Sequence, residues 1–337
     1  MKHFRTKAVA VGAVLPLALL AACGGADSAE GGAGDVELTL AHTYTEDQPP
    51  HTCGAQVIKE EVEAADVGMN VEIFPASQLG GDSDRIASVQ SGDIDIDLQG
   101  ASALAAVHEP IGVVDAAYVF EDGQHLVDFF RGEESEQLKS DFQEAAGSIR
   151  ILGAWSIGAR HFTANKPIRE PGDLEGLRMR FPGSPQFLLN AKAMGARATE
   201  VAYEELYLAL QQGTVDGQEN PLSNIDASNL SEVQDYLSLS SHAQNSNLIV
   251  VGDVYDELTS EQQEALDSAV QTAVDQVPGC VEEAEQKLLE EYRSGDDIEV
   301  VDDVDVAAFR EKTDAWFRAN LEGGALEAYE AIRSSAP

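Results

Sequence analysis

The chain has 337 residues, of which 43% are hydrophobic, and its 60 acidic residues against 21 basic ones give a net charge of −39. This length permits two medium domains, and the hydrophobic content is sufficient for packed cores, which excludes wholesale disorder. Nucleic acids and anionic lipid surfaces are poor partners for such a charge. Because the acids are spread along the chain, the favoured interpretation is a solvated surface suited to saline surroundings, and an acidic surface that serves a cationic ligand is the alternative.

The first 22 residues have the features of a secretory signal. Basic residues precede an apolar run at 8–20 that is too short to span a bilayer comfortably, and Leu-Ala-Ala precedes Cys23. A cysteine at this point resembles the bacterial lipobox, in which the thiol is lipidated and becomes the mature N-terminus; the alternative is an ordinary signal peptide with an accidental cysteine. Residues 23–34 are expected to form a flexible tether. We therefore expect an exported protein, periplasmic or at the cell surface, anchored to the outer face of the cytoplasmic membrane through Cys23.

Two cysteines remain in the mature chain. Cys53 and Cys280 lie more than 200 residues apart. An oxidising compartment favours a disulfide between them, with two free thiols as the alternative. Such a bridge would be structural and would stabilise the fold by about 2–4 kcal/mol. Nothing in the spacing indicates a metal site.

Strand-like and helical segments alternate along the rest of the chain. Strands are expected at 36–42, 71–75, 92–98, 149–156, 177–181, 198–202, 236–240 and 247–251, and helices at 49–65, 84–91, 184–194, 203–213, 222–233, 259–293 (interrupted by Pro278-Gly279) and 308–319. Repeated strand–helix–strand units predict an α/β fold with mainly parallel sheets and helices on their faces. Ligands of such sheets collect at the carboxyl ends of the strands.

Three aspartates, Asp93, Asp95 and Asp97, recur with period two in the third of these strands. This spacing places them on one strand face with apolar residues on the other. The pattern favours a strand edge over a metal site.

The stretch from Tyr203 to Pro221 combines a helix with a polar run. Apolar residues from Tyr203 to Leu210 recur at offsets of three, four and seven, which is one face of a helix, and Gly213 suits its C-terminal cap. Residues 215–221 are mostly polar and end in a proline that holds Asn220 extended. We expect this run to be a loop facing a cleft.

Arg160 and Arg180 are candidate anion ligands, because each lies near a strand end or loop. Arginine presents a planar fork of donors that matches a carboxylate and keeps its charge when desolvated. The alternative is an ion pair at the surface or at a hinge. No nucleophile elbow, metal-spaced histidine pair or phosphate loop is present, so we expect no catalytic residue, no metal and no cofactor. His161 is interpreted as a neighbour of the site and not as a general base.

The run Leu-Ala-Leu-Gln-Gln-Gly-x-Val-Asp-Gly-Gln-Glu-Asn-Pro at 208–221, preceded by Gly-Leu-Arg-Met-Arg-Phe-Pro at 176–182, resembles the solute-binding subunits of tripartite ATP-independent periplasmic (TRAP) transporters of the dicarboxylate-binding type. Phe-Pro-x-x-Gln-Leu-Gly at 74–80 also matches, and the likeness extends from about residue 42 to 255. It implies a two-domain periplasmic-binding-protein-like fold, type II-like, with a ligand cleft between domains joined by hinge strands. The implied division assigns residues 35–157 plus about 246–285 to domain I, and 158–245 plus about 286–330 to domain II.

The resemblance also implies roles for individual residues. Arg180 is expected to pair with a ligand carboxylate, Asn220 to donate its amide to the same ligand, and Arg160 to line the cleft as a second arginine. Tyr203 takes an aromatic position over the ligand, where the family often has phenylalanine, and its added hydroxyl is expected to favour a more polar ligand. Two weaker candidates are Gln78, from the first domain, and Trp155, from the hinge.

The expected function is capture of a small organic acid anion outside the cytoplasmic membrane and its delivery to the integral membrane subunits of a TRAP transporter. The alternatives are a sugar acid such as a uronate or a zwitterionic solute as ligand, and more distantly an extracellular hydrolase or an adhesive lipoprotein. A monomer is the default state for a binding protein that is handed between partners.

Overall fold

The computed structural model describes residues 36–147 and 149–337. The expected signal sequence at 1–22, the lipidation site Cys23 and the tether at 23–34 lie outside the described residues. Within the described part, no helix combines the length and apolar character needed to cross a membrane.

In the described part of the chain the strands form one sheet, in which eight have the order β2-β1-β3-β9-β4-β7-β5-β6, while β8 pairs with β4 and β10 with β8. The strands are β1 (Val36–Ala41), β2 (Met69–Phe74), β3 (Ile96–Gln99), β4 (Arg150–Ala164), β5 (Arg178–Phe181), β6 (Arg197–Glu200), β7 (Gly217–Pro221), β8 (Tyr236–Ser238), β9 (Gln244–Val251) and β10 (Glu299–Val301). Pairing is parallel among β1, β2 and β3 and among β5, β6 and β7, as expected. The expectation of mainly parallel sheets is wrong at the centre, where β9 and β4 run antiparallel to their neighbours.

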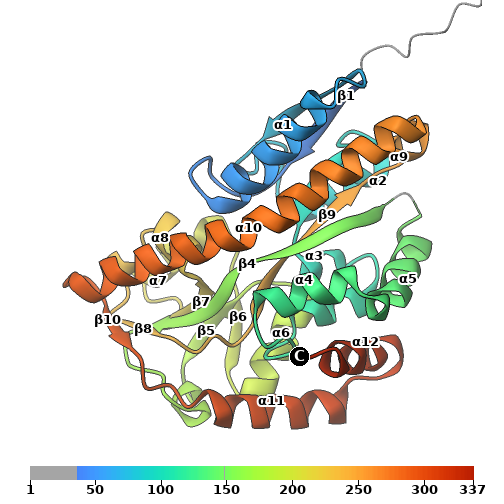
Figure 1. Ribbon diagram of the computed structural model, residues 1–337. Coiled ribbons are helices and arrows are strands. Elements are labelled where there is room, and N and C mark those ends of the chain that lie inside the picture. Colours follow the sequence, from blue (N-terminus) through green and yellow to red (C-terminus); the bar gives the residue numbers. More distant parts are fainter. Residues whose placement is uncertain (1–35, 148) are drawn as a thin grey trace, which may run out of the picture. The chain divides into compact units, whose positions relative to one another are not determined.

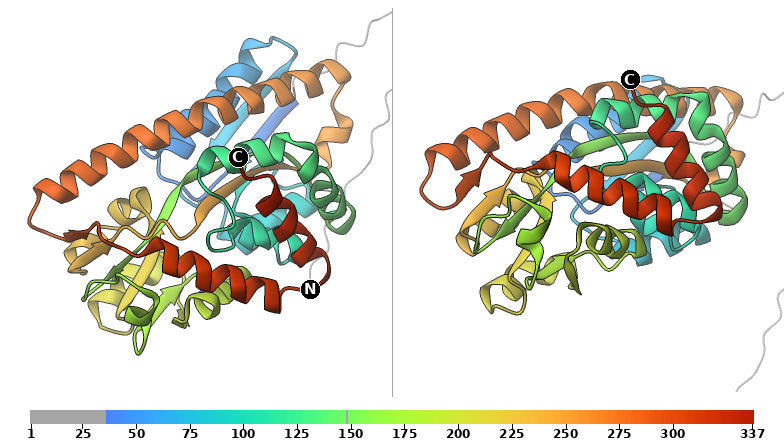
Figure 2. Two further views of the ribbon diagram at one scale, coloured as in Figure 1. Left: turned by 60° about the horizontal axis from the view of Figure 1, so that its bottom comes forward. Right: turned by 90° about the horizontal axis from the view of Figure 1, so that it is seen from below.

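Helices cover the sheet. They are α1 (Gln56–Ala64), α2 (Asp82–Ser91), α3 (Ala101–Leu104), α4 (Gly123–Arg131), α5 (Glu136–Ala146), α6 (Pro185–Met194), α7 (Leu206–Gln211), α8 (Leu222–Ala227), α9 (Val254–Glu257), α10 (Ser260–Ser294), α11 (Val306–Asn320) and α12 (Gly323–Ser334), with shorter turns η1 (Pro50–Ala55), η2 (Glu109–Asp115), η3 (Glu133–Ser135), η4 (Pro171–Leu174), η5 (Tyr203–Glu205) and η6 (Leu230–Glu232). The long helix α10 packs on α1 and β4 (Figure 1). Near the end of the chain, α11 packs on α6 and α12 on η2 (Figure 2, red).

Helix α10 is continuous, so the expected interruption at Pro278-Gly279 is wrong. Proline lacks an N–H and removes one backbone hydrogen bond from a helix interior. The apolar face of the helix runs through this point, since Val274, Val277 and Val281 on both sides of Pro278 are all buried. Packing of that face therefore outweighs the local defect. Helix α12, which has no counterpart among the expected elements, buries Tyr329 and Ile332.

Cys53 in η1 and Cys280 in α10 are joined by a disulfide across a sequence separation of 227 residues. The replacements Cys53→Ser and Cys280→Ser, alone or together, should each lower the free energy of unfolding by roughly 2–4 kcal/mol, because the bridge restricts the unfolded chain. Urea unfolding of the oxidised protein and the variants measures this. An unchanged midpoint in the single variants would show that the bridge contributes nothing.

The three period-two aspartates do not share an exposed strand edge, which corrects the expectation for this segment. Asp93 is exposed, whereas Asp95 accepts a hydrogen bond from the backbone N–H of Thr39 at 2.7 Å. Asp97 is fully buried in the interior strand β3 and accepts from Nε of Arg85 at 2.9 Å. In the described part of the chain, no group of three or more His, Cys, Asp or Glu side chains is placed to hold a metal ion.

Glu285 of α10 lies against Gly158, the glycine with φ of +109° in β4 where the pairing with β9 is irregular. Its Oε1 is buried and has no hydrogen-bond partner among the described residues. Burial raises the pKa of Glu285 from 4.5 to about 7, partly opposed by the backbone N–H of Ala159. A glycine is favoured at 158 because its φ of +109° is strained for a residue with a side chain, and a Cβ there would also displace this carboxyl group.

This buried carboxyl group predicts a pH-dependent stability. Because the folded state holds a proton that the unfolded chain releases near pH 4.5, stability should fall as the pH rises from about 5 to 8. The variant Glu285→Gln should lack this dependence and be more stable than the wild type by about 1–3 kcal/mol at pH 8. Urea unfolding at several pH values measures the difference, with Glu283→Gln, an exposed position on the same helix, as the control. Parallel pH profiles of the wild type and Glu285→Gln would contradict the prediction.

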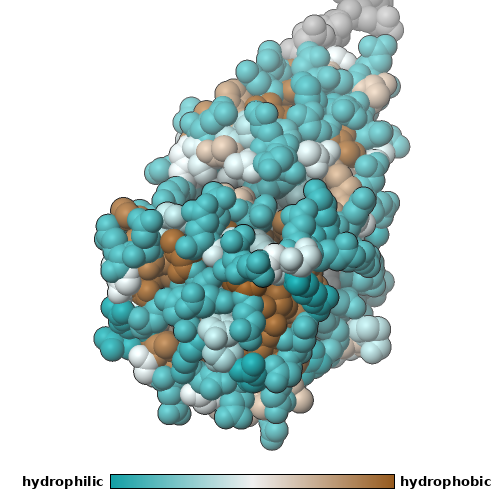
Figure 3. All heavy atoms as spheres, turned by 90° about the vertical axis from the view of Figure 1, so that its left-hand side faces the viewer, coloured by the Kyte–Doolittle hydropathy of each residue, from teal (hydrophilic) through white to brown (hydrophobic). Residues whose placement is uncertain are grey.

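Hydrophilic residues cover most of the face shown in Figure 3, and hydrophobic residues are visible only in limited areas between them. Among the described residues, Leu208 is the only large hydrophobic side chain that is highly exposed. This distribution fits the interpretation of the acidic residues as a solvated surface.

Candidate functional site

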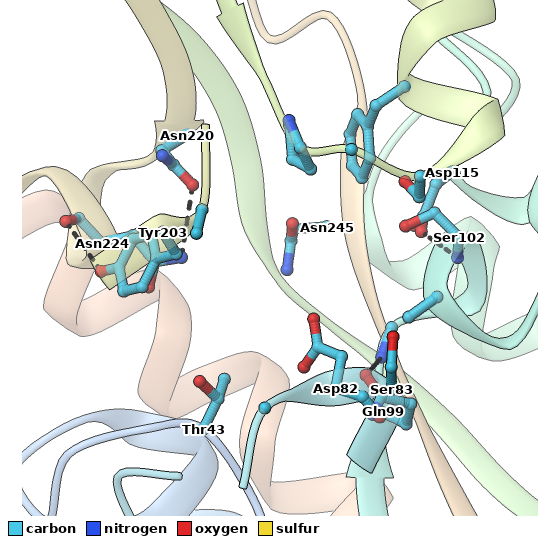
Figure 4. A pocket seen from close by; sticks show the side chains of 18 of the residues that line it. Thr43, Asp82, Ser83, Gln99, Ser102, Asp115, Tyr203, Asn220, Asn224 and Asn245 are labelled. Carbon is cyan, nitrogen blue, oxygen red and sulfur yellow. Dashed lines mark hydrogen bonds between the residues drawn. The ribbon is translucent and has the colours of Figure 1, made fainter. Parts of the chain in front are cut away.

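A pocket of about 720 Å³ is lined by residues from both halves of the sheet. One set comes from the segments after β1 and β3 and from the start of α2, and the other from β4, β5, β7, β9 and the turn η5. Figure 4 shows Thr43, Asp82, Gln99 and Asn220 around the same space. Thr43 and Gln99 stand at the carboxyl ends of β1 and β3, where ligands of α/β proteins collect.

Four of the six expected ligand-binding residues line this pocket: Arg160, Arg180, Tyr203 and Asn220. Gln78 and Trp155 do not. Gln78 is exposed in the turn after β2, where its backbone N–H donates to the carbonyl oxygen of Pro75. Trp155 is fully buried against Gly54, because its side chain points from β4 into the core beneath η1.

The run at 215–221 is not a loop. Its last five residues form the buried strand β7, which pairs antiparallel with β4 and parallel with β5. Its polar side chains can be buried because they form hydrogen bonds with one another and with side chains of β4. Gln218 donates to Oγ1 of Thr163 at 3.1 Å and Asn220 donates to Oε1 of Gln218 at 2.6 Å. Strand pairing holds Asn220 opposite His161 at the pocket.

Arg160 is held in a buried ion pair with Glu219. Its Nε and Nη2 both donate to the carboxylate of Glu219, with Nη2 to Oε1 at 2.7 Å, and Nη1 donates to Oδ1 of Asn245. The guanidinium carbon lies 4.6 Å from the ring centroid of Phe187. Because Glu219 balances its charge, Arg160 orients the asparagines of the pocket and is not a free anion site.

Glu219 and His242 were not among the expected site residues. Glu219 is fully buried, and its Oε2 lies 3.1 Å from Nε2 of His242, whose Nδ1 lies 2.8 Å from Oγ of Ser240. Burial acts to raise the pKa of Glu219, but the charge of Arg160 and the hydrogen bonds from His242 and Arg160 outweigh it and hold the pKa below its ordinary value. The sequence signal for Glu219 was its position next to Asn220 in the Gln-Glu-Asn-Pro motif. A carboxylate in a buried strand needs a cation beside it, so a buried Glu219 would have predicted the pair with an arginine.

Arg180 differs from Arg160 in having no ion-pair partner within the described part of the chain. Its side chain is only 3% exposed, and its Nε donates to the carbonyl oxygen of Val201 at 2.8 Å. Its two terminal nitrogens have no hydrogen-bond or ion-pair partner among the described residues, and the residue lines the pocket. Burial lowers the pKa of Arg180 to about 10, so the group remains charged at neutral pH. A desolvated guanidinium with an unused fork is suited to bind an anion from the pocket.

The hydroxyl group of Tyr203 forms hydrogen bonds within the protein. It donates to the carbonyl oxygen of Asn224 at 3.3 Å and accepts from Oγ of Ser228 at 2.7 Å. Figure 4 shows Tyr203 beside Asn224 at one side of the pocket. The hydroxyl group therefore has hydrogen-bond partners within the protein. That it favours a more polar ligand stays a prediction.

Comparison with known proteins agrees with this architecture. The pattern of the bacterial extracellular solute-binding protein family 7 (DctP) matches residues 40–322. The 2,3-diketo-L-gulonate-binding periplasmic protein YiaO of Escherichia coli is 30% identical over 243 residues, 72% of this chain and 73% of that protein.

Two solved structures of TRAP periplasmic solute-binding proteins are also similar. One from Polaromonas, bound to D-erythronate, has a TM-score of 0.81 at 29% identity and covers 89% of this chain and 98% of its own. One from Roseobacter denitrificans, with bound L-galactonate, has a TM-score of 0.80 at 29% identity and covers 89% and 99%. The expected two-domain α/β fold is thereby confirmed. The chain belongs to the bacterial extracellular solute-binding protein family 7, the solute-binding proteins of TRAP transporters.

Proposed function

We propose that this protein captures a small organic acid anion outside the cytoplasmic membrane through Arg180 and delivers it to the integral membrane subunits of a TRAP transporter. The observation that carries the proposal is Arg180, a buried cation that lines the pocket and whose terminal nitrogens have no partner among the described residues. Asn220, Arg160 and Tyr203 complete the wall around it. A micromolar dissociation constant corresponds to about −8 kcal/mol, which one desolvated bidentate pair and several hydrogen bonds can supply.

Sugar acids are the ligand class that we favour, because the three similar proteins described above are named for diketogulonate or hold erythronate or galactonate. Dicarboxylates and zwitterionic solutes remain the alternatives, because each carries at least one carboxylate and Arg180 requires only one. An extracellular hydrolase remains the more distant alternative.

A thermal-shift screen of the chain without its expected signal sequence tests the proposal. The panel contains sugar acids, dicarboxylates, zwitterions and neutral sugars. A ligand that binds only the native state raises the melting temperature by mass action. We expect shifts from carboxylates and none from neutral sugars. Shifts from neutral compounds alone would overturn the assignment.

The proposed mechanism is closure of two domains around the ligand, with β4 and β9 as connecting strands. The division into 35–157 plus about 246–285 and 158–245 plus about 286–330 is part of this proposal. Small-angle scattering should give a smaller radius of gyration when a saturating acid is present. An unchanged radius would favour a rigid adhesive or structural role.

Anchoring through Cys23 also belongs to the proposal. The protein expressed in a bacterial host should be recovered with the membrane fraction, and Cys23→Ala should release it into the soluble extracytoplasmic fraction. Equal distribution of the two forms would contradict a lipid anchor. We propose a monomer in solution, which sedimentation measurements test.

A further inference from the structure

The charged residues that line the pocket are mostly acidic. The basic ones are Arg160 and Arg180, and the acidic ones are Asp82, Asp84, Asp115, Glu200 and Glu204. Since Glu219 already balances Arg160, Arg180 is the one lining cation of the described chain that is left to balance an anion. The pocket therefore offers a place for one negative charge and surrounds the remaining space with acids.

Asp82 is the acid best placed to contact a ligand. It opens helix α2, its side chain is 55% exposed, and Figure 4 shows its carboxylate pointing into the pocket in the direction of Asn245. Asp115, by contrast, is buried and fully engaged by the backbone N–H groups of Ser102 (2.7 Å) and Ser246 (3.1 Å). Asp115 thus shapes the wall, whereas Asp82 retains acceptor capacity on its free oxygen.

Among the residues that the structure describes, no cation near Asp82 is free to receive a second carboxylate. Arg85 donates from Nη2 to Asp82 at 3.0 Å, from Nε to Asp97 at 2.9 Å and from Nη1 to the carbonyl oxygen of Gly80 at 3.0 Å. Its side chain is 1% exposed, so it lies behind Asp82 and not on the pocket surface. A negatively charged group at this end of a ligand would face Asp82 without a compensating partner.

The uncharged side chains around Asp82 both donate and accept hydrogen bonds. They include Thr43, Ser83 and Asn245, whereas the amide of Gln99 is already bonded to Asp97 and to the backbone N–H of Gly100. Oδ1 of Asn245 accepts from Arg160, while its Nδ2 has no partner among the described residues. Hydroxyl groups suit such a mixed set because they donate and accept, whereas an ammonium group only donates. Asp82 is already paired with Arg85, so it needs a donor and not a full positive charge.

We propose that the ligand is a polyhydroxylated monocarboxylate, bound with its carboxylate at Arg180 and a hydroxyl group donating to Asp82, and that Asp82 excludes a second carboxylate at that end. This inference rests on the proposed function and adds its substrate class and specificity residue. Dicarboxylic sugar acids are then rejected, although they carry the same first carboxylate.

Matched acid pairs test the proposal by calorimetric titration. L-Galactonate and galactarate differ only at the far end, as do threonate and tartrate, where a CH2OH group in the first becomes a carboxylate in the second. Of L-galactonate and threonate, the one that binds the wild type more tightly should have a Kd at least roughly 100-fold lower than that of its dicarboxylic partner. The reason is that the second carboxylate of the partner would meet the like charge of Asp82 in a partly desolvated site. In Asp82→Asn the ratio should fall to about 10-fold or less, since the like charge is gone while the side chain keeps its size.

Asp93→Asn is the control, because Asp93 is exposed at the other end of α2 and does not line the pocket. It should leave the ratio unchanged. If a dicarboxylic acid binds the wild type as tightly as its partner, or if Asp82→Asn keeps the full ratio, the proposal is overturned while acid capture at Arg180 stands. If none of the four acids binds, the proposal is also overturned, and the wider carboxylate panel then decides whether the proposed function fails with it.

Discussion

Replacing Arg180 with methionine should weaken acid binding by about 3–5 kcal/mol, or roughly 100- to 5,000-fold in Kd. The reason is that the ligand carboxylate would enter a desolvated pocket and find no cation, since Arg160 is already neutralised by Glu219. The fork of Arg180 makes two donors available at once, and methionine keeps much of the side-chain volume without them. Calorimetric titration with the acid that gives the largest thermal shift measures the change.

The same substitution should not destabilise the empty protein. Arg180 is a buried cation that donates one hydrogen bond within the described chain, so removing its charge removes a desolvation cost. Arg178→Met is the matched control on the same strand. Arg178 pairs with Asp216 and is 41% exposed, and it does not line the pocket. Equal losses of affinity in the two variants would show that the effect is general and not a carboxylate contact.

Replacing Glu219 with glutamine should lower the free energy of unfolding by about 3–5 kcal/mol, because it leaves the buried guanidinium of Arg160 without its anion. Glutamine preserves the shape and one acceptor, so the loss reports the charge. The pKa of Glu219 is held below its ordinary value, which means that its contribution is present above the pKa of an unfolded glutamate and is lost as the pH falls through the folded pKa. The gap between wild type and variant, measured by urea unfolding, should therefore narrow in acid.

A double variant separates pairing from packing. Arg160→Met combined with Glu219→Leu removes both charges, and its loss of stability should be clearly smaller than the sum of the two single losses, because neither charge is left unpaired. Additive losses would contradict an interaction between these side chains.

Elements with strong local signals could be predicted from the sequence. Helix α6 begins after Ser184 with Pro185 at its first position and ends at Gly195, whose φ is +87°. These residues act within a single turn, so their effect does not depend on the rest of the fold. Arg160 and Arg180 were candidates from their positions near strand ends, and the likeness at 176–182 and 208–221 added the family and, with it, Asn220 and Tyr203.

The predictions that were wrong concern residues whose environment is set by partners distant in sequence. The polar composition at 215–221 indicates a loop, but Gln218 is buried because Thr163 bonds to it from β4, 55 residues away. The sequence predicts Trp155 in a strand, and the structure has it in β4, but the direction in which its side chain leaves that strand decides that it enters the core. Asp82 has no distinguishing signal, since it is one of 60 acids and only the tertiary structure aims it into the pocket.

The most direct test of carboxylate capture compares an acid with its primary amide in calorimetric titrations against the wild type and Arg180→Met. L-Galactonate and L-galactonamide serve as the first pair, and the best acid of the thermal-shift panel with its amide as the second. The wild type should bind the acid at least roughly 100-fold more tightly than the amide, and Arg180→Met should bind both weakly with little difference between them. An amide that binds the wild type as well as the acid does would contradict recognition of the carboxylate by Arg180.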